Sequence, residues 1–205
     1  MTDEQKYDIM PDDLKDCVAF HGHLCPGLVY GYRVSREAMR LLNISRAADE
    51  EIVTICENDS CAVDGFQRLL GSTAGKGNLI IRNYGKNAYT VFSRKAGKAY
   101  RFSRTASYCY GGKDPEDFEI LEKAVAEKTA TPDQMKRQKQ MKAMDLVSKS
   151  FDDIFITTEV EYKELPYAPL APSKACASCG ELTMETRMIR TSDRGLLCIP
   201  CSEQG

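Results

Sequence analysis

The sequence predicts an α+β core domain followed by a small four-cysteine zinc finger. Helical and strand-like segments occupy separate stretches of residues 26–162, as is typical of α+β folds. Three prolines then fall within residues 166–172, where they disfavour a helix and favour an extended spacer. Two C-x2-C pairs follow these prolines. We therefore expect a core domain over residues 1–165, a linker over 166–172 and a finger over 173–205.

The first half of the core is expected to alternate between helices and a strand. Residues 26–43 begin with a proline, end with an asparagine and place apolar side chains near helical spacing, which predicts a helix. Residues 51–57 alternate as a strand, and residues 61–70 form a short helix. Asp59 and Ser60 are candidate caps of that short helix.

The second half is expected to contain a meander of strands, two helices and a last strand. Turn-forming residues separate three consecutive strand-like runs, which predicts an antiparallel meander. Thr131 and Gln134 form a capping-box signature at the start of the second helix. The predicted strands are residues 78–84, 88–94, 98–104 and 154–162, and the predicted helices are residues 115–127 and 132–150.

The composition is that of an ordinary globular chain. Hydrophobic residues make up 42% and charged residues 28% of the 205 positions, which excludes collagen-like, coiled-coil and low-complexity classes. The formal net charge of -2 gives no overall attraction to nucleic acids or anionic membranes. No apolar run approaches the ~18 residues that cross a bilayer, and residues 1–16 lack the apolar stretch of a signal peptide. We therefore expect a cytoplasmic protein without a membrane partner.

The nine cysteines are the most informative residues. In a reducing compartment, an odd number of cysteines in two groups favours metal ligands and reactive thiols over disulfides. Near the C-terminus, the spacing C-x2-C-x18-C-x2-C lets two pairs of sulfurs converge on one tetrahedral zinc ion, through Cys176, Cys179, Cys198 and Cys201. So short a segment has few large apolar side chains, so the zinc would supply its folding free energy. A four-cysteine site is closed, which predicts a structural zinc.

A second cluster of metal-ligating residues lies at the start of the core. His21 and His23, the two histidines of the chain, fall within four residues of Cys25, at the start of the first predicted helix. The backbone N–H groups and the dipole of a helix N-terminus favour the thiolate form of such a cysteine. Cys61 has the same position at the next predicted helix, and Asp64 follows one turn later.

We expect these five residues to converge on a metal-binding or reactive-thiol pocket. Cys25, Cys61 and Asp64 are the candidate catalytic residues, and His21, His23, Cys25 and Cys61 are the candidate ligands of a core metal. Asp64 would act as a ligand, as a base or as the hydrogen-bond partner of a ligand. The alternative is that both cysteines pack as small apolar side chains while the histidines bond turn carbonyls.

Other reactive residues are expected to be structural. Cys17, Cys56 and Cys109 are isolated in the sequence, which favours packing as small apolar side chains. The glycine-rich residues 71–77 lack the spacing of a phosphate loop, so a tight turn is expected, in which Lys76 could meet an anion. The basic residues between positions 136 and 142 are interpreted as a solvated helix face.

Three core motifs, taken with the cysteine pairs, resemble one family. They are FHGHLCPGLVYGYR (residues 20–33), CAVDGFQ (61–67) and GKGNLIIRNYGK (75–86). Their order and spacing resemble the FmdE family, named after a component of formylmethanofuran dehydrogenase, over essentially the whole chain. The positions that match its pattern are His21, His23, Cys25, Cys61, Asp64 and Lys76, whereas Ser72 stands where the family commonly has cysteine.

The resemblance implies an FmdE-like α+β core, a C-terminal finger of the treble-clef type and a homodimer. It also implies association with the molybdenum or tungsten enzyme that reduces carbon dioxide onto methanofuran in methanogens. The sequence itself specifies no substrate.

Two functions of different classes follow from these observations. The first, which we adopt, is a metal-binding accessory protein whose core holds zinc or another thiophilic ion while the finger docks a metalloenzyme partner. The second is an enzyme in which Cys25 or Cys61 is a nucleophile, or in which a core metal activates water beside Asp64. A finger that binds nucleic acid is disfavoured by the balanced charge.

Overall fold

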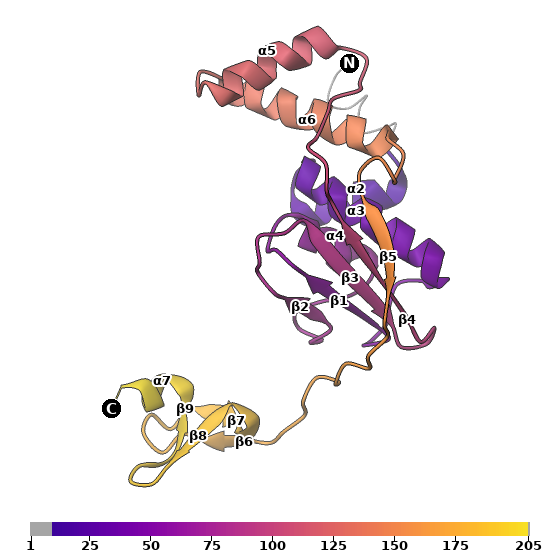
Figure 1. Ribbon diagram of the computed structural model, residues 1–205. Coiled ribbons are helices and arrows are strands. Elements are labelled where there is room, and N and C mark those ends of the chain that lie inside the picture. The colour runs from indigo at the N-terminus through magenta and orange to yellow at the C-terminus, as the bar shows by residue number, and fades with distance from the viewer. Residues whose placement is uncertain (1–9, 205) are drawn as a thin grey trace. The chain divides into compact units, whose positions relative to one another are not determined.

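The computed structural model describes residues 10–204, in two units that are treated separately below. One unit ends at Leu165 and the other begins at Pro166. The first contains long helices and the main sheet, and the second contains two small hairpins and a short helix (Figure 1). Residues 1–9 and 205 lie outside the described part, and with them most of the segment in which no signal peptide is expected.

The larger unit is built on a five-stranded sheet with the strand order β2-β1-β3-β4-β5. Strand β1 pairs with β3, β3 with β4 and β4 with β5, all antiparallel, whereas β2 runs parallel to β1. The predicted α+β class is therefore confirmed. The strands are β1 (Ile52–Cys56), β2 (Leu79–Ile81), β3 (Ala88–Ser93), β4 (Lys98–Ser103) and β5 (Ile156–Val160).

The predicted meander is wrong at its first strand. Helix α4 (Ala62–Leu69) connects β1 to β2 and carries the chain back to the end of the sheet at which β1 begins. Strand β2 therefore runs parallel to β1. The turn expected between β2 and β3 instead bonds back to the end of β1. The backbone N–H groups of Tyr84 and Lys86 both donate to the carbonyl oxygen of Glu57.

Five helices accompany the sheet in the described part of the larger unit, and four of them were predicted. They are α2 (Asp12–His21), α3 (Pro26–Leu42), α4, α5 (Pro115–Ala126) and α6 (Pro132–Ser148). The capping box of α6 is present, with Gln134 N–H donating to the hydroxyl of Thr131. The predicted caps of α4 are wrong, because Asn58 accepts the backbone and side-chain hydrogen bonds of Ser60 instead. In the part of the chain described, no helix is long and apolar enough to cross a membrane.

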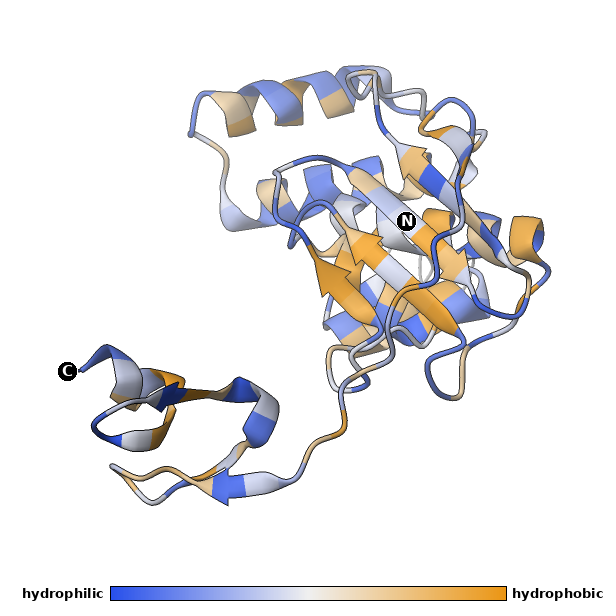
Figure 2. Ribbon diagram, turned by 60° about the horizontal axis from the view of Figure 1, so that its bottom comes forward, coloured by the Kyte–Doolittle hydropathy of each residue, from blue (hydrophilic) through white to orange (hydrophobic). Residues whose placement is uncertain are grey.

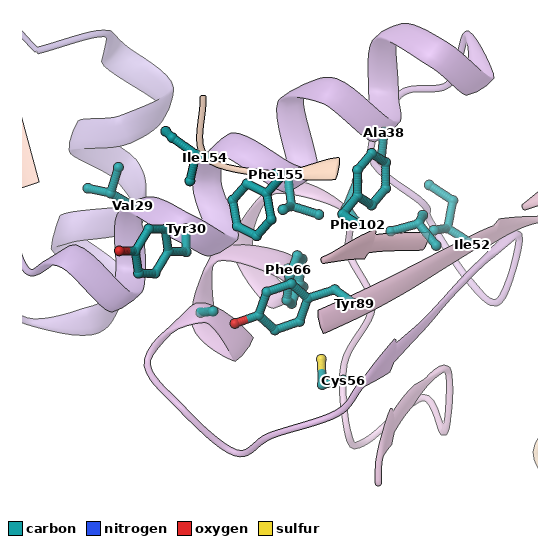
Figure 3. Close-up of a cluster of buried hydrophobic side chains, with 14 of the residues drawn as sticks. Val29, Tyr30, Ala38, Ile52, Cys56, Phe66, Tyr89, Phe102, Ile154 and Phe155 are labelled. Carbon is teal, nitrogen blue, oxygen red and sulfur yellow. The ribbon is translucent and has the colours of Figure 1, made fainter. Parts of the chain in front are cut away.

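The main core lies between the sheet and helices α3 and α4. Strands β1 and β3 are buried along their whole length, and Figure 2 shows strands of this sheet largely in the orange of hydrophobic residues. The rings of Phe66 and Tyr89 lie 4.9 Å apart, and Tyr30 meets Phe155 edge to face at 5.8 Å (Figure 3). This aromatic cluster packs α4 against the sheet.

Helices α3 and α4 cross at two glycines. A Cβ atom on Gly31 would lie 2.0 Å from the carbonyl oxygen of Ala62, and one on Gly65 would lie 2.7 Å from the carbonyl carbon of Gly31. Only glycine permits so close an approach of two backbones. At the start of α3, a Cβ atom on Gly27 would lie 3.0 Å from Cβ of Cys61. The crossing therefore brings the first turns of α3 and α4 together.

The smaller unit consists of two antiparallel hairpins and a short helix. Cys176 and Cys179 lie in the turn between the first two strands, Cys198 ends the last strand and Cys201 lies in the helix. This succession of cysteine turn, hairpin and helix is that of a treble clef. Its elements are β6 (Ser173–Ala175), β7 (Leu182–Met184), the 3-10 helix η1 (Glu185–Arg187), β8 (Met188–Thr191), β9 (Gly195–Cys198) and α7 (Ile199–Glu203).

Candidate functional site

The core cluster forms where α2 ends and α3 begins. Gly22 ends α2 with a φ of 93°, a left-handed conformation that suits glycine, and so turns the chain back toward α3. His21 Nε2 lies 3.6 Å from the sulfur of Cys25, the N-cap residue of α3. One ligand atom from each of His21, His23 and Cys25 lies within 4.8 Å of the other two. The structure therefore brings these three predicted ligands together.

Asp64 lies behind His21, on the side away from Cys25. Its Oδ2 atom is 2.6 Å from Nδ1 of His21, and its Oδ1 atom accepts a hydrogen bond from Gln67 at 3.2 Å. A carboxylate at Nδ1 holds the proton there and leaves Nε2 as the acceptor or metal-binding atom. Asp64 is thus the hydrogen-bond partner of His21, a candidate ligand. The part of Gln67 was not predicted, although it falls in the same sequence motif.

Cys61 approaches the cluster from the start of α4. A Cβ atom on Gly27 would lie 3.6 Å from its sulfur, so Cys61 lies beside the start of α3, but it is not one of the three residues whose ligand atoms lie within 4.8 Å of one another. Burial raises the pKa of Cys25 to about 11, although the N–H of Leu28 lies 3.4 Å from its sulfur and acts in the opposite direction. Burial thus opposes the thiolate form that the helix N-terminus favours.

His23 is the exposed member of the cluster. Its ring centroid lies 4.6 Å from that of His21. Desolvation, followed by the charges of His21 and Lys139, lowers the pKa of His23 and favours the neutral imidazole that binds metals. His23 also lines a cavity of about 480 Å³ between α2 and α6.

The four cysteines of the finger form the second cluster. Their sulfurs all lie within 4.8 Å of one another, and those of Cys179 and Cys198 are 3.9 Å apart. The backbone N–H groups of Cys179 and Cys198 lower the pKa of Cys176 to about 6, whereas desolvation and hydrogen bonds with neighbouring thiols raise the pKa values of Cys179 and Cys198. Such N–H groups stabilise a thiolate, the form in which cysteine binds a metal.

One pair of donor atoms in each cluster has the spacing expected around a tetrahedral zinc ion. Two sulfurs on one zinc ion lie about 3.8 Å apart, and a sulfur and an imidazole nitrogen about 3.6 Å apart. The corresponding separations are 3.9 Å between Cys179 and Cys198 and 3.6 Å between Cys25 and His21. The four-cysteine cluster can therefore hold a metal ion, and His21, His23 and Cys25 offer a second set of three donors.

Two residues named by sequence pattern lie outside the core cluster. The ammonium group of Lys76 lies 2.8 Å from the carbonyl oxygen of Asp49 and holds the loop beside it. Ser72 is fully buried and accepts a hydrogen bond from the hydroxyl of Thr54 at 2.8 Å. Both residues therefore bond to β1 or to the loop before it, and neither contributes to the core cluster.

The isolated cysteines have different environments. Cys17 and Cys56 are fully buried, and burial raises the pKa of each to about 12, so their predicted packing is confirmed. The same prediction is wrong for Cys109, which is exposed on the irregular segment between β4 and α5. A lone cysteine carries no periodic signal that distinguishes these two cases.

Comparison with known proteins identifies the family. The family model described as "FmdE, Molybdenum formylmethanofuran dehydrogenase operon" matches residues 20–156, more than half of the chain. This chain belongs to the FmdE family. The matched range contains all five residues of the core cluster and ends before the finger.

Two further proteins are similar to this FmdE family member. A probable S-adenosyl-L-methionine-binding protein of Archaeoglobus fulgidus is 31% identical over 193 residues, which cover 89% of this chain and 50% of that protein. The chain thus spans about half the length of this relative.

The second is the crystal structure of a tungsten formylmethanofuran dehydrogenase FmdE-like protein from Syntrophus aciditrophicus. It aligns with a TM-score of 0.58 at 20% identity, over 97% of this chain and 93% of that one. At this identity the likeness concerns the fold. It confirms the predicted FmdE-like α+β architecture, which here carries a four-cysteine cluster near the C-terminus.

Proposed function

We propose that this FmdE family protein binds two metal ions with different roles. A zinc ion held by Cys176, Cys179, Cys198 and Cys201 would stabilise the finger, since four thiolates leave no open position. A second zinc ion or similar thiophilic ion would bind in the core, held by His21, His23, Cys25 and Cys61. The alignment of Asp64, His21 and Cys25 carries this proposal, because it aims the free imidazole nitrogen at the thiol.

The core ion would differ from the finger ion in access to solvent. His21 is 11% exposed and Cys25 is buried, whereas His23 is exposed and borders the cavity. The carboxylate of Asp64 orients His21 and increases its basicity, which strengthens metal binding. His23 is therefore the ligand at which an outside group would most readily meet the ion.

Metal stoichiometry of the full-length protein tests this proposal. Elemental mass spectrometry should find about two metal ions per chain. Replacing His21→Gln together with Cys25→Ser should remove one ion, and replacing Cys176→Ser together with Cys198→Ser should remove the other. The exposed Cys109→Ser is the matched control and should retain both ions. If the wild-type protein holds one ion that is lost with the finger substitutions alone, the core centre is wrong.

We further propose that the protein acts as a cytoplasmic homodimeric accessory partner of a formylmethanofuran dehydrogenase-type molybdenum or tungsten enzyme. The description of the matched family model supports this partner. Exposed apolar side chains on the finger, among them Leu182 and Ile189, offer a docking surface.

Co-expression with the catalytic subunits of such an enzyme tests the partner. Co-elution in size-exclusion chromatography should be lost with Leu182→Ser, which removes an apolar side chain that is 76% exposed. Ile120→Ser, at a 65% exposed position on α5, is the matched control. Failure of the wild-type protein to co-elute contradicts the accessory role and leaves the metal sites to be judged by their own test.

A second candidate function is a metal- or thiol-dependent enzyme that uses the same cluster. The order carboxylate, imidazole, thiol in Asp64, His21 and Cys25 is also that of a cysteine nucleophile with its base. Alkylation of Cys25, followed by mass spectrometry, distinguishes the two functions. A nucleophile reacts with and without a chelator, whereas a metal ligand reacts only after chelation.

A further inference from the structure

A cavity of about 480 Å³ lies beside the core cluster, within the usual range of small-molecule sites. Residues before, within and after α2 form one wall, and the first half of α6 forms the other. Most of its lining is apolar, contributed by Met10, Val18, Leu24, Pro132 and Met135. Such a lining suits a ligand with an apolar body.

The polar lining is basic on one side. Helix α6 contributes the side chains of Lys136 and Lys139, and the loop after α2 contributes His23. Among the described residues that line the cavity, none carries a carboxylate. This side of the cavity therefore favours a negatively charged group.

We propose that this cavity binds a small organic carboxylate, with its apolar body against Val18 and Met135 and its carboxylate between Lys139 and His23. The proposal rests on the proposed function, because it places the bound ligand beside the ion held at His23. It also names the substrate or ligand class of that site as an apolar monocarboxylate. Lys139 is exposed, as the interpretation of a solvated helix face expects, and it also borders the cavity.

Methionine methyl groups provide a site-resolved test. The full-length protein is labelled with 13C at its eight methionine methyl groups and titrated with 4-phenylbutyrate. The signals of Met10 and Met135, which line the cavity, should shift, and those of Met184 and Met188 in the finger should not. Unchanged Met10 and Met135 signals at saturating probe would overturn the proposal.

The charge requirement is tested by substitution and by a neutral probe. Lys139→Gln should weaken 4-phenylbutyrate binding about fivefold, the loss of one charge-assisted contact. Binding of 4-phenylbutanol should be unchanged by the same substitution. Lys123→Gln on α5, which breaks an exposed ion pair with Glu127, is the matched control and should change neither affinity. Equal effects of Lys139→Gln on both probes would contradict a carboxylate site.

Metal content measured on the same samples separates this proposal from the proposed function. Lys139→Gln should retain every metal ion, because Lys139 is not a ligand. Methyl shifts in a protein that lacks a core metal would support the cavity and contradict the metal centre. A core metal without methyl shifts would contradict the cavity and leave the metal centre supported.

Discussion

The two cysteine clusters of this protein are assembled in different ways. In the finger, each ligand pair comes from one local C-x2-C turn, and in the described part Leu197 is the only large apolar side chain that is fully buried. In the core, the donors come from three helix ends, and His21 is bonded to a carboxylate 43 residues away. Packing can therefore hold the core cluster in place, whereas we expect the finger to depend on a bound metal ion.

The largest expected effect is the loss of the finger on metal removal. Zinc binding supplies ~10 kcal/mol or more to the folding of such modules, far more than the burial of one leucine. A chelator should therefore unfold the finger while the larger unit keeps its fold. In NMR spectra, the methyl signals of Met184 and Met188 should collapse to random-coil positions, and those of the core residues Met39 and Met144 should stay dispersed. Loss of the finger and core methyl signals at the same chelator concentration would contradict the proposed difference between the two clusters.

The difference between the clusters also explains what the sequence could predict. The C-x2-C spacing is a local geometric constraint, so the finger cluster follows from the sequence alone. Helices α3 and α6 carry clear start and end signals, such as Pro26, Asn43 and the capping box at Thr131. The parallel pairing of β2 was missed because it depends on where α4 directs the chain, which no local pattern records.

The residues of the core cluster were predicted as a group, but which side chain bonds to which was not. The sequence shows His21, Cys25 and Asp64 near helix starts, but not that the carboxylate bonds His21 and the imidazole faces the thiol. Helix α2, which carries His21 at its end, was not predicted, although acidic residues fill its first turn. The contact between His21 and Asp64 also depends on the crossing of α3 and α4 at Gly31 and Gly65. No periodic pattern in the sequence marks these two glycines.

The second largest effect is expected from that crossing. In Gly31→Ala, the new methyl group would collide with the carbonyl oxygen of Ala62, because its ideal position lies only 2.0 Å away. Separating α3 from α4 should cost about 3 kcal/mol, which exceeds the ~1 kcal/mol gain in helix propensity.

The measurements are the free energy of unfolding in urea and the metal content of the purified variant. The core metal should be lost and the finger metal retained, because the crossing positions Cys61 and Asp64 but not the finger. Gly75→Ala, where the added methyl would meet no atom within 4 Å, is the matched control. Equal stability of the two variants would show that the helices can separate at no cost.

A smaller effect is expected from the hydrogen bond of Asp64. In Asp64→Asn, His21 loses the carboxylate that orients and polarises it, so the core metal should bind about 10–100-fold more weakly. Competition with a chromophoric chelator measures this affinity. The finger ion and the free energy of unfolding should change little, since the Asp64 side chain is about one third exposed. Asp59→Asn is the control, and an equal loss of affinity there would contradict a specific role of Asp64.

The smallest predicted effect concerns how the sheet holds the segment before Cys61. Glu57, directly after β1, accepts two hydrogen bonds from Arg101 on β4, at 2.7 and 3.0 Å, and these bonds lower the pKa of Glu57. Arg101→Gln should therefore cost about 1 kcal/mol near pH 7. A lowered carboxyl pKa stabilises the folded state above the unfolded pKa of about 4.3 and stops doing so as the pH falls through the folded value.

The stability difference between wild type and Arg101→Gln should therefore be constant from pH 6 to pH 8 and shrink below about pH 4.3. Urea titrations at each pH measure it. Lys98→Gln on the same strand is the matched control, because its 3.7 Å ion pair with Glu159 is half exposed and should contribute almost nothing. Metal content should stay at the wild-type value in both variants. Loss of the core ion in Arg101→Gln would show that the core cluster depends on a single distant contact, and would contradict the view that packing as a whole holds it in place.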